Sequence, residues 1–357
     1  MKTRVVVWGT GNVGRPAIRA VLSHADLDLV GVIVSSDAKV GRDAGELAGL
    51  PPVGVKASQD AASVLGSGVD VVVYVASADV RPDEAMAELL QCLSAGCNVV
   101  STSFYDFLHP ALVPPEQMAK IKEATTAGNS SLFVSGIDPG WAMDVMPLFG
   151  SGMVSGIQQI RCQEIFNYAL YDAPDIVRHI IGFGQSMDEL PLMLHDEVLL
   201  KIWEPMVSLV AQGLGVELDE VKTHVERRPL EKTVHVEGMG DFIAGSQGAF
   251  RFEVQGMKNG KPLIVAEHIT RIDAGCAQDW PYPPNEGGCH QVVIKGNPDL
   301  TITVHGDDHF DSGAAAGGNA TAANRLVNAI PAVCAAKPGV VSPLDLPTIT
   351  GAAQLIL

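Results

Sequence analysis

The sequence predicts an α/β fold in which an N-terminal doubly wound parallel sheet is followed by a second α+β domain built on a largely antiparallel sheet. Early in the chain, short apolar runs alternate with helix-like stretches, which is the order that parallel strands with crossover helices require. Beyond about residue 220, successive β-type segments replace that alternation. We therefore expect a dinucleotide-binding domain over residues 1–140 and a substrate-binding and dimerisation domain over residues 141–318. A C-terminal helix and tail over residues 319–357 are expected to pack back on the first domain.

A glycine-rich turn near the N-terminus is the strongest functional signal. The apolar run at residues 5–8 leads into Gly9, Gly11 and Gly14 at Gly-x-Gly-x-x-Gly spacing, and a helix-like stretch follows. The first glycine permits the tight turn, the second lets a pyrophosphate approach the backbone, and the third lets the helix pack closely on the strand. The helix N-terminus then faces the phosphates. This predicts a Rossmann domain whose cofactor-binding positions are Gly9, Thr10, Gly11, Asn12, Val13, Gly14, Ser35, Ser36, Lys39, Ala76 and Ser77.

The end of the second predicted strand bears on the choice of cofactor. An NAD enzyme usually carries an acidic residue there for the ribose hydroxyls. Here the positions are Ser35 and Ser36, followed by Asp37, Lys39 and Arg42. Two hydroxyls and two cations suit a 2′-phosphate, so the sequence favours NADP(H), while Asp37 leaves NAD(H) possible.

Composition limits the classes of partner and location. The formal net charge of −17 argues against nucleic acid and against an anionic membrane surface. Mean hydropathy is high at +0.20, but Gly, Pro or a charged residue interrupts each long apolar run, so we expect buried surfaces and a homodimer interface instead of a membrane span. The six cysteines form no metal-type pair, and no signal region precedes the first strand, which predicts free thiols, a cytoplasmic protein and no metal.

Polar residues at strand ends are the catalytic candidates, because neither a Tyr-x-x-x-Lys pair nor a Gly-x-Ser-x-Gly motif is convincing. Asn167 and Tyr168 end a strand expected over residues 157–168 and would hydrogen-bond the reacting heteroatom. His268, on a later strand, and Asp138, in a Pro-Gly turn, are reserve proton handlers. The expected walls of the substrate pocket are Phe104, Tyr105, Trp141 and a helical stretch over residues 188–213, expected as one long or two short helices, that carries His195.

Five segments resemble one known family: WGTGNVG at 8–14, KVGRDAG at 39–45, GIDPG at 136–140, EHITR at 267–271 and VNAIP at 327–331. They are similar to the native amine dehydrogenases and 2,4-diaminopentanoate dehydrogenases, which are often labelled dihydrodipicolinate-reductase-like. The resemblance implies a homodimer with a Rossmann domain and an α+β domain. It implies reduction of a small apolar ketone plus ammonia to an amine with NAD(P)H. The pocket positions that it implies are Trp141, Asn167, Tyr168, His195 and His268.

One position departs from that family. The family places a glutamate after the fourth strand, where it would bind and deprotonate the amine, and Phe104 stands there in this chain. A phenyl ring cannot take a proton, and Asp106 is the nearest substitute. The departure keeps two alternatives open. One is a carbonyl reductase or alcohol dehydrogenase, which needs only a hydrogen-bond donor for its ketone. The other is a non-catalytic nucleotide-sensing protein.

Overall fold

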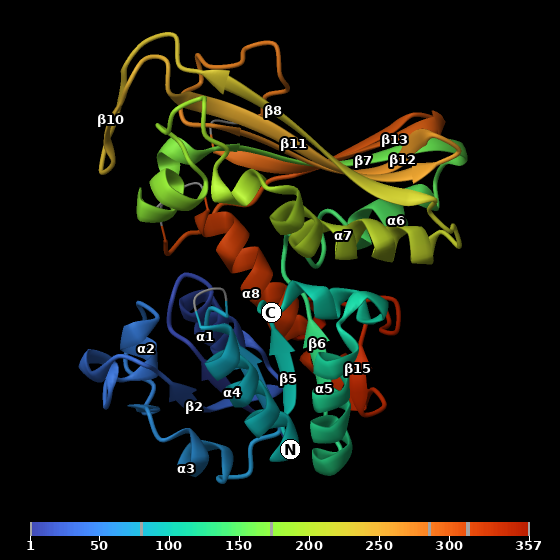
Figure 1. The fold of residues 1–357 in the computed structure, drawn as a ribbon. Coiled ribbons are helices and arrows are strands. Elements are labelled where there is room, and N and C mark those ends of the chain that lie inside the picture. The colour runs from blue at the N-terminus through green and yellow to red at the C-terminus, as the bar shows by residue number, and fades with distance from the viewer. Residues whose placement is uncertain (1, 79–80, 172–173, 285–286, 312–314, 356–357) are drawn as a thin grey trace. The chain divides into compact units, whose positions relative to one another are not determined.

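The computed structural model describes residues 2–78, 81–171, 174–284, 287–311 and 315–355 (Figure 1). The chain divides into two compact units, one formed by Met1–Gly140 with Asn319–Leu357 and the other by Trp141–Gly318. A seven-stranded parallel sheet builds the first unit, and a six-stranded, mostly antiparallel sheet builds the second. The predicted fold class is therefore confirmed.

The parallel sheet has the strand order β15-β6-β5-β4-β1-β2-β3. Its strands are β1 (Thr3–Trp8), β2 (Leu27–Ile33), β3 (Ala57–Ser58), β4 (Val71–Tyr74), β5 (Asn98–Ser101), β6 (Ser131–Val134) and β15 (Gly339–Val341). The helices of this unit are α1 (Gly14–Ser23), α2 (Ala44–Leu47), α3 (Ala61–Leu65), α4 (Pro82–Ser94), α5 (Pro115–Gly128) and α8 (Ala316–Ala335).

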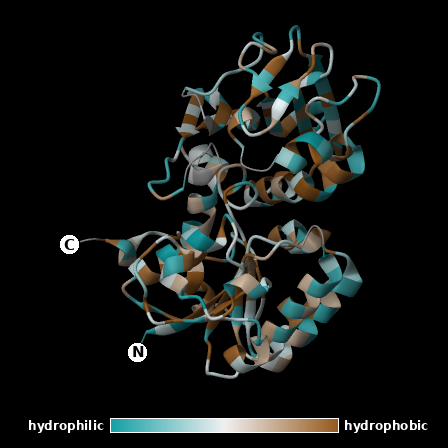
Figure 2. Ribbon diagram, turned by 90° about the vertical axis from the view of Figure 1, so that its left-hand side faces the viewer, coloured by the Kyte–Doolittle hydropathy of each residue, from teal (hydrophilic) through white to brown (hydrophobic). Residues whose placement is uncertain are grey.

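Both faces of the parallel sheet are buried, which explains why its strands read as continuous apolar runs. One core contains Val5 and Val7 of β1 with side chains of α1 and α8, and the other contains Val6 and Trp8 with side chains of α4 and α5. Figure 2 shows hydrophobic colours concentrated on these strands. Alternate side chains of β1 are therefore buried in the cores on opposite faces of the sheet, and this fixes the strand from which the glycine turn begins.

The tail contains an edge strand, β15, that the sequence did not indicate. Residues 339–341 pair in parallel with residues 131–133 of β6, and Val341 is buried. Three residues are too short a run for periodicity to indicate a strand, so only the tertiary pairing reveals it.

The second sheet has the order β14-β13-β7-β12-β11-β8. Its strands are β7 (Ser155–Asn167), β8 (Glu220–Pro229), β11 (Gln247–Lys258), β12 (Lys261–Arg271), β13 (Gly288–Asn297) and β14 (Leu300–Val304), and β9 (Val234–Val236) pairs separately with β10 (Gly240–Phe242). The helices α6 (Val145–Ser151) and α7 (Asp196–Gly213) lie along one face (Figure 1). Among the described residues, no helix has the length and apolar content needed to cross a membrane.

Two local features of this unit follow from nearby residues. Asn259 and Gly260 form the tight hairpin turn that an Asn-Gly pair favours: both residues have positive φ, 51° and 73°, and Lys258 pairs with Lys261. The helix expected over residues 188–213 begins only at Asp196, after a 3₁₀ turn at Leu192–Leu194. The placement of His195 within a helix was therefore wrong, because His195 is the residue immediately before the first turn of α7.

Candidate active site

The glycine turn between β1 and α1 has the geometry of a dinucleotide site. Gly9 has a φ of 107°, and a Cβ there would lie 3.0 Å from the backbone of Val75 and Ala76. A Cβ on Gly14 would lie only 2.1 Å from the carbonyl oxygen of Gly9, whereas one on Gly11 would meet nothing within 4 Å. The outer glycines thus make the turn tight, and the middle one leaves open the side from which a pyrophosphate can approach.

A cation lies against this turn. The Lys39 ammonium donates to the carbonyl oxygen of Thr10 at 3.2 Å and to its hydroxyl at 3.0 Å. Nearby, Gln59 donates to Asp37 and to the carbonyl oxygen of Ser35, both at 2.9 Å. These contacts bring the two predicted cofactor segments, the glycine turn and the loop after β2, together.

The carboxyl ends of β4 and β5 are joined by hydrogen bonds. The Ser103 hydroxyl donates to the Ala76 carbonyl at 2.7 Å, and the Ser103 N–H donates to the Ser101 hydroxyl at 2.9 Å. Phe104 follows with a left-handed φ of 64° and packs edge-on against Phe107. An aromatic ring therefore stands after β5 at the position where the resembled family has a glutamate.

Four further predicted site residues of this unit differ in burial. Asp138, in the turn after β6, and Tyr105, after β5, are partly buried. Ser36 and Ser77 are exposed. A Cβ on Gly140 would lie 2.0 Å from the Gly136 nitrogen, so the Pro-Gly turn is closely folded.

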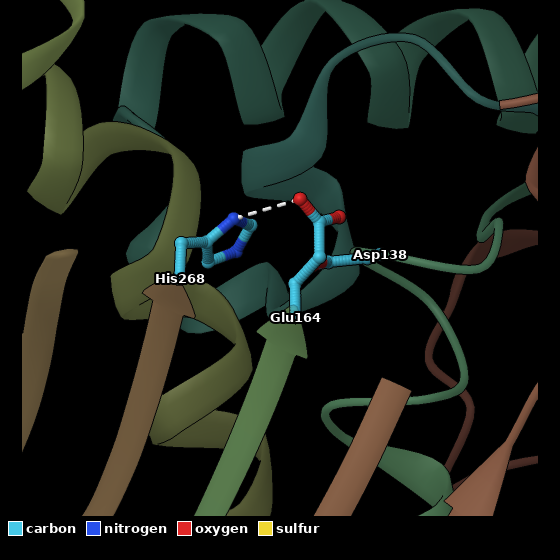
Figure 3. Close-up of side chains that lie close together, drawn as sticks. All are labelled: Asp138, Glu164 and His268. Atoms are coloured by element: carbon cyan, nitrogen blue, oxygen red, sulfur yellow. Dashed lines mark ion pairs between the residues drawn. The ribbon is translucent and has the colours of Figure 1, made fainter. Parts of the chain in front are cut away.

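In the second unit, three polar side chains face one another across neighbouring strands. Glu164 of β7 pairs in register with His268 of β12 on one side and with His290 of β13 on the other. The Glu164 carboxylate lies 3.2 Å from His268 Nδ1 and 3.6 Å from His290 Nε2. Figure 3 shows the first of these pairs, and Asp138, which is also drawn there, belongs to the first unit. Both histidine side chains are 7% exposed and the Glu164 side chain is 16% exposed.

Aromatic rings fix the imidazole of His268. Phe252 stacks on it with centroids 4.6 Å apart and planes 12° apart, and Trp203 of α7 meets it at 4.7 Å and 64°. Burial by itself would raise the pKa of Glu164, but the positive charge of His268 and the hydrogen bonds from both histidines outweigh it and hold the pKa of this carboxyl well below its ordinary value. Glu164 is therefore an ionised, largely buried carboxylate.

Tyr171 lies near this group, and Asn167 faces away from it. Tyr168 stacks on Tyr171 at 4.9 Å, and burial, together with the negative charge of Glu164, raises the pKa of Tyr171. The Asn167 side chain accepts from the Ala169 N–H at 3.1 Å. By strand alternation it belongs to the sheet face opposite Glu164.

Asn167 lines a cavity of about 460 Å³ in the second unit. Arg271, buried in its wall, donates to the backbone carbonyls of Cys276, Ala277 and Trp280. Of the predicted pocket residues in this unit, Trp141 is partly buried and His195 is exposed. The complete lining of the cavity is Phe166, Asn167, Leu170, Arg271, Ala274, Tyr282, Pro283 and Pro284.

The sequence reasoning missed Glu164 and His290. The available signal was alternation along the strand, which places Glu164 on the same face as the apolar Cys162 and Phe166. An acid on an otherwise apolar face is costly without a partner, so it marks a polar site. Carboxylates and imidazoles are also side chains that bind metal ions in proteins. The expectation that this protein uses no metal therefore stays a prediction.

Comparison with known proteins relates both parts of the chain to known families. Residues 3–127 match the family of the dihydrodipicolinate reductase N-terminus, and residues 141–356 match the 2,4-diaminopentanoate dehydrogenase C-terminal domain. An amine dehydrogenase of Streptomyces virginiae is 50% identical over 344 residues, which cover 96% of this chain and 95% of that protein. A 2,4-diaminopentanoate dehydrogenase of Acetoanaerobium sticklandii is 22% identical over 97% of this chain and 94% of that protein.

Among solved structures, an amine dehydrogenase from Mycobacterium smegmatis superposes with a TM-score of 0.77 at 23% identity and covers 99% of each chain, which shows a shared fold. The family match over residues 141–356 and the 50% identity across nearly the whole chain also show a shared family. This protein is a member of the amine dehydrogenase and 2,4-diaminopentanoate dehydrogenase family of NAD(P)-dependent oxidoreductases.

Proposed function

We propose that the protein interconverts a small apolar ketone plus ammonia with the corresponding amine, using a nicotinamide cofactor. The observation that carries the proposal is the 50% identity, over 96% of the chain, to a protein named amine dehydrogenase. The glycine turn fits the cofactor, because it is tight at Gly9 and Gly14 and open at Gly11. When bound there, the nicotinamide gives or takes the hydride.

We propose NADP(H) as the preferred cofactor. Lys39 is anchored on the glycine turn through Thr10, so its ammonium is held near the expected ribose position, with Ser35 and Ser36 on the same loop. Asp37, the residue that would favour NAD(H), accepts a hydrogen bond from Gln59. Both contacts support a loop that offers positive charge and hydroxyls to a 2′-phosphate.

His268 is the proposed proton handler, because it is a buried imidazole beside an ionised carboxylate. Tyr168 is the proposed hydrogen-bond donor to the reacting heteroatom. Asn167 and Asp138 stay candidates for substrate orientation. An acid–base group in the core of the second unit favours an enzyme over the nucleotide-sensing alternative.

A carbonyl reductase on the same scaffold is the second candidate function. The observation that favours it is Phe104, whose ring gives the end of β5 an apolar side chain in place of a carboxylate. A ketone requires only a hydrogen-bond donor, so such a site would reduce ketones without ammonia.

We also propose a cytoplasmic homodimer that associates through the open face of the second sheet. Helices α6 and α7 lie along one face, and the opposite face carries Arg161, whose guanidinium contacts Glu253 at 2.6 Å and Glu267 at 2.7 Å. A largely buried charge network on the face away from the helices is suited to a self-complementary interface. Sedimentation equilibrium that shows twice the chain mass would support it, and a monomer at micromolar concentration would refute it. The free cysteines of the described residues fit a reducing compartment.

The deciding experiment measures NADPH and NADH oxidation with small linear and cyclic ketones, with and without excess ammonium. Oxidation that requires ammonium is the expected result and establishes amine dehydrogenation. Oxidation indifferent to ammonium would instead support the carbonyl reductase. Cofactor binding without turnover of any ketone would support the nucleotide-sensing protein.

A further inference from the structure

We propose that the cavity of the second unit is a binding site for a small organic carboxylate with an apolar body, whose negative charge pairs with Arg271. This inference goes beyond the proposed function, because no step of the proposed reaction uses Arg271. It stands on the position of this guanidinium, on its hydrogen bonds and on the composition of the cavity wall.

The strand register places two donor side chains next to each other in the cavity wall. Asn167 is the last residue of β7 and Arg271 is the last residue of β12, and the two are direct neighbours across this parallel pair. Both side chains line the cavity, which has a volume of about 460 Å³. This volume lies in the range of sites that bind small molecules.

The Arg271 guanidinium is held in place by the backbone. Its Nε donates to the Cys276 carbonyl at 3.1 Å, and its Nη2 donates to the carbonyls of Ala277 and Trp280 at 3.1 and 3.0 Å. The guanidinium carbon also lies 4.1 Å from the centre of the Tyr282 ring. A ligand therefore meets a cation whose position is fixed before binding, which lowers the entropy cost of the contact.

One nitrogen of this guanidinium has unused donors. The three carbonyls take the N–H of Nε and both N–H groups of Nη2, which leaves the two N–H groups of Nη1. The Tyr282 hydroxyl, which itself donates to the Ala274 carbonyl, can accept at most one of them. At least one N–H of Nη1 thus has no acceptor among the residues that the structure describes. Because Arg271 lines the cavity and its Nη1 is not sealed in the core, a ligand can reach this N–H.

The charge of Arg271 has no close counter-ion in the described part of the chain. Arg271 is 3% exposed, and the acceptors of its hydrogen bonds are neutral carbonyls. Burial lowers its pKa, and the charges of Tyr282, Cys276 and Asp279 offset this only in part. Asp279 itself is 69% exposed and lies 3.7 Å from Arg228. A buried cation without a charged partner is costly, so a carboxylate in the cavity would supply the missing partner.

The remaining wall determines the rest of the ligand. Its apolar members are Phe166, Leu170, Ala274, Pro283 and Pro284. The Asn167 side-chain oxygen accepts from the Ala169 N–H, so its NH2 group is the end that can donate to a ligand beside Arg271. A carboxylate held by these two side chains would place an aromatic or aliphatic body against the apolar wall. Sulfate or phosphate would leave that wall uncovered, so the cavity favours an organic anion.

The test titrates the full-length protein with 3-phenylpropionate at neutral pH by calorimetry. The neutral 3-phenylpropionamide has nearly the same shape and serves as the matched ligand. The carboxylate should bind saturably, and the amide should bind about 10- to 100-fold more weakly because it lacks the charge. Sulfate and phosphate should also bind more weakly than the carboxylate. The absence of saturable carboxylate binding, an equal affinity for the amide, or an equal affinity for sulfate would each overturn the proposal.

Arg271→Gln removes the cation and should weaken the binding of 3-phenylpropionate by about 10- to 100-fold, with little effect on the amide. Arg228→Gln is the matched control. The Arg228 guanidinium lies 4.9 Å from the ring centre of Trp280, in the same region, but Arg228 is not part of the cavity lining that the structure describes. This control should bind the carboxylate as the wild type does. Undiminished carboxylate binding by Arg271→Gln would refute the assignment.

Ala274→Phe keeps the test decisive if Arg271→Gln does not fold. Ala274 is exposed and lines the cavity, so a phenyl group there can occupy the ligand space while the three hydrogen bonds of Arg271 remain. We expect thermal unfolding close to that of the wild type and loss of carboxylate binding. Retained binding by folded Ala274→Phe would place the ligand elsewhere and contradict the proposal. None of these readouts uses turnover, so they decide the matter even if the protein oxidises no amine.

Discussion

The phenyl ring of Phe252 lies flat against the imidazole of His268, because the two residues are direct neighbours in the antiparallel pair of β11 and β12. Phe252 is fully buried, so its ring has two effects: it fills the core beneath α7 and it defines the plane of the histidine.

Phe252→Leu should therefore reduce both stability and turnover. The lost ring contact and the altered packing are expected to cost about 1–3 kcal/mol, and kcat should fall because His268 gains freedom to rotate. Urea unfolding and amine-oxidation kinetics measure the two effects. Phe242→Leu is the control, since Phe242 is equally buried but packs against Arg178; it should lose stability and keep the kcat of the folded enzyme.

Two glycines of the turn should respond differently to the same substitution. Gly14→Ala must displace the backbone of Gly9, so we expect a clear loss of stability. Gly11→Ala meets no atom of the protein, and thermal unfolding should stay within about 2 °C of the wild type. Its methyl group would occupy the approach of the pyrophosphate, so the Kd for NADPH should rise at least about tenfold. Tight NADPH binding by Gly11→Ala would contradict the cofactor site.

Lys39→Ala should separate the two cofactors. Loss of a charge-assisted contact to the 2′-phosphate should raise the KM for NADPH by about 10- to 100-fold and leave that for NADH nearly unchanged. Lys56→Ala, which removes an exposed lysine of the same unit, just before β3, should change neither value. An equal rise for both cofactors would indicate that Lys39 acts only by holding Thr10.

Arg161→Met should destabilise the protein by about 2–4 kcal/mol at pH 7, because it leaves the buried carboxylates of Glu253 and Glu267 without their shared cation. Burial favours a raised pKa for Glu253, but the hydrogen bond from Arg161 outweighs it and lowers the pKa below its ordinary 4.5. The stability that this pair contributes is thus present at neutral pH and lost as pH falls below about 4.5. The stability difference between variant and wild type should shrink at pH 4, measured by urea unfolding. Lys222→Met, which removes the cation of an exposed pair with Glu220, should cost at most about 1 kcal/mol at either pH.

Removal of residues 337–357 should destabilise the nucleotide-binding unit. Val341 of β15 is buried, and Leu346 and Ile349 pack on the same core. Loss of β15 would also expose the edge of β6, so the truncated chain should aggregate on mild heating. Light scattering during a thermal ramp measures this, and Thr350→Ala, at an exposed position, should match the wild type. A truncated chain as stable as the wild type would mean that β15 contributes nothing to the fold.

The features that the sequence could predict are those with local causes. The glycine turn follows from three residues within one strand–helix junction, and the hairpin at Asn259 and Gly260 follows from two residues with positive φ. The onset of α7 was misjudged by several residues, although Pro191 and the acidic first turn at Asp196 and Glu197 both favour the later start.

The features that escaped prediction depend on segments far apart in the chain. β15 becomes a strand only because β6 offers it an edge. Glu164, His268 and His290 lie on three separate strands, and no local pattern states which residues will be opposite one another. The candidate site could therefore be predicted one residue at a time, as for His268, but its central pair could not.

β7 has a parallel neighbour on one side and an antiparallel neighbour on the other, and Glu164 meets a histidine on each. A slip of β7 by a single residue would turn Glu164 to the opposite face, toward the carboxylates that surround Arg161. A chain that pairs its strands wrongly would thus lose the proposed acid–base group together with the core. Catalytic activity in this protein is therefore also an assay of correct strand pairing, and refolding yields could be followed by turnover alone.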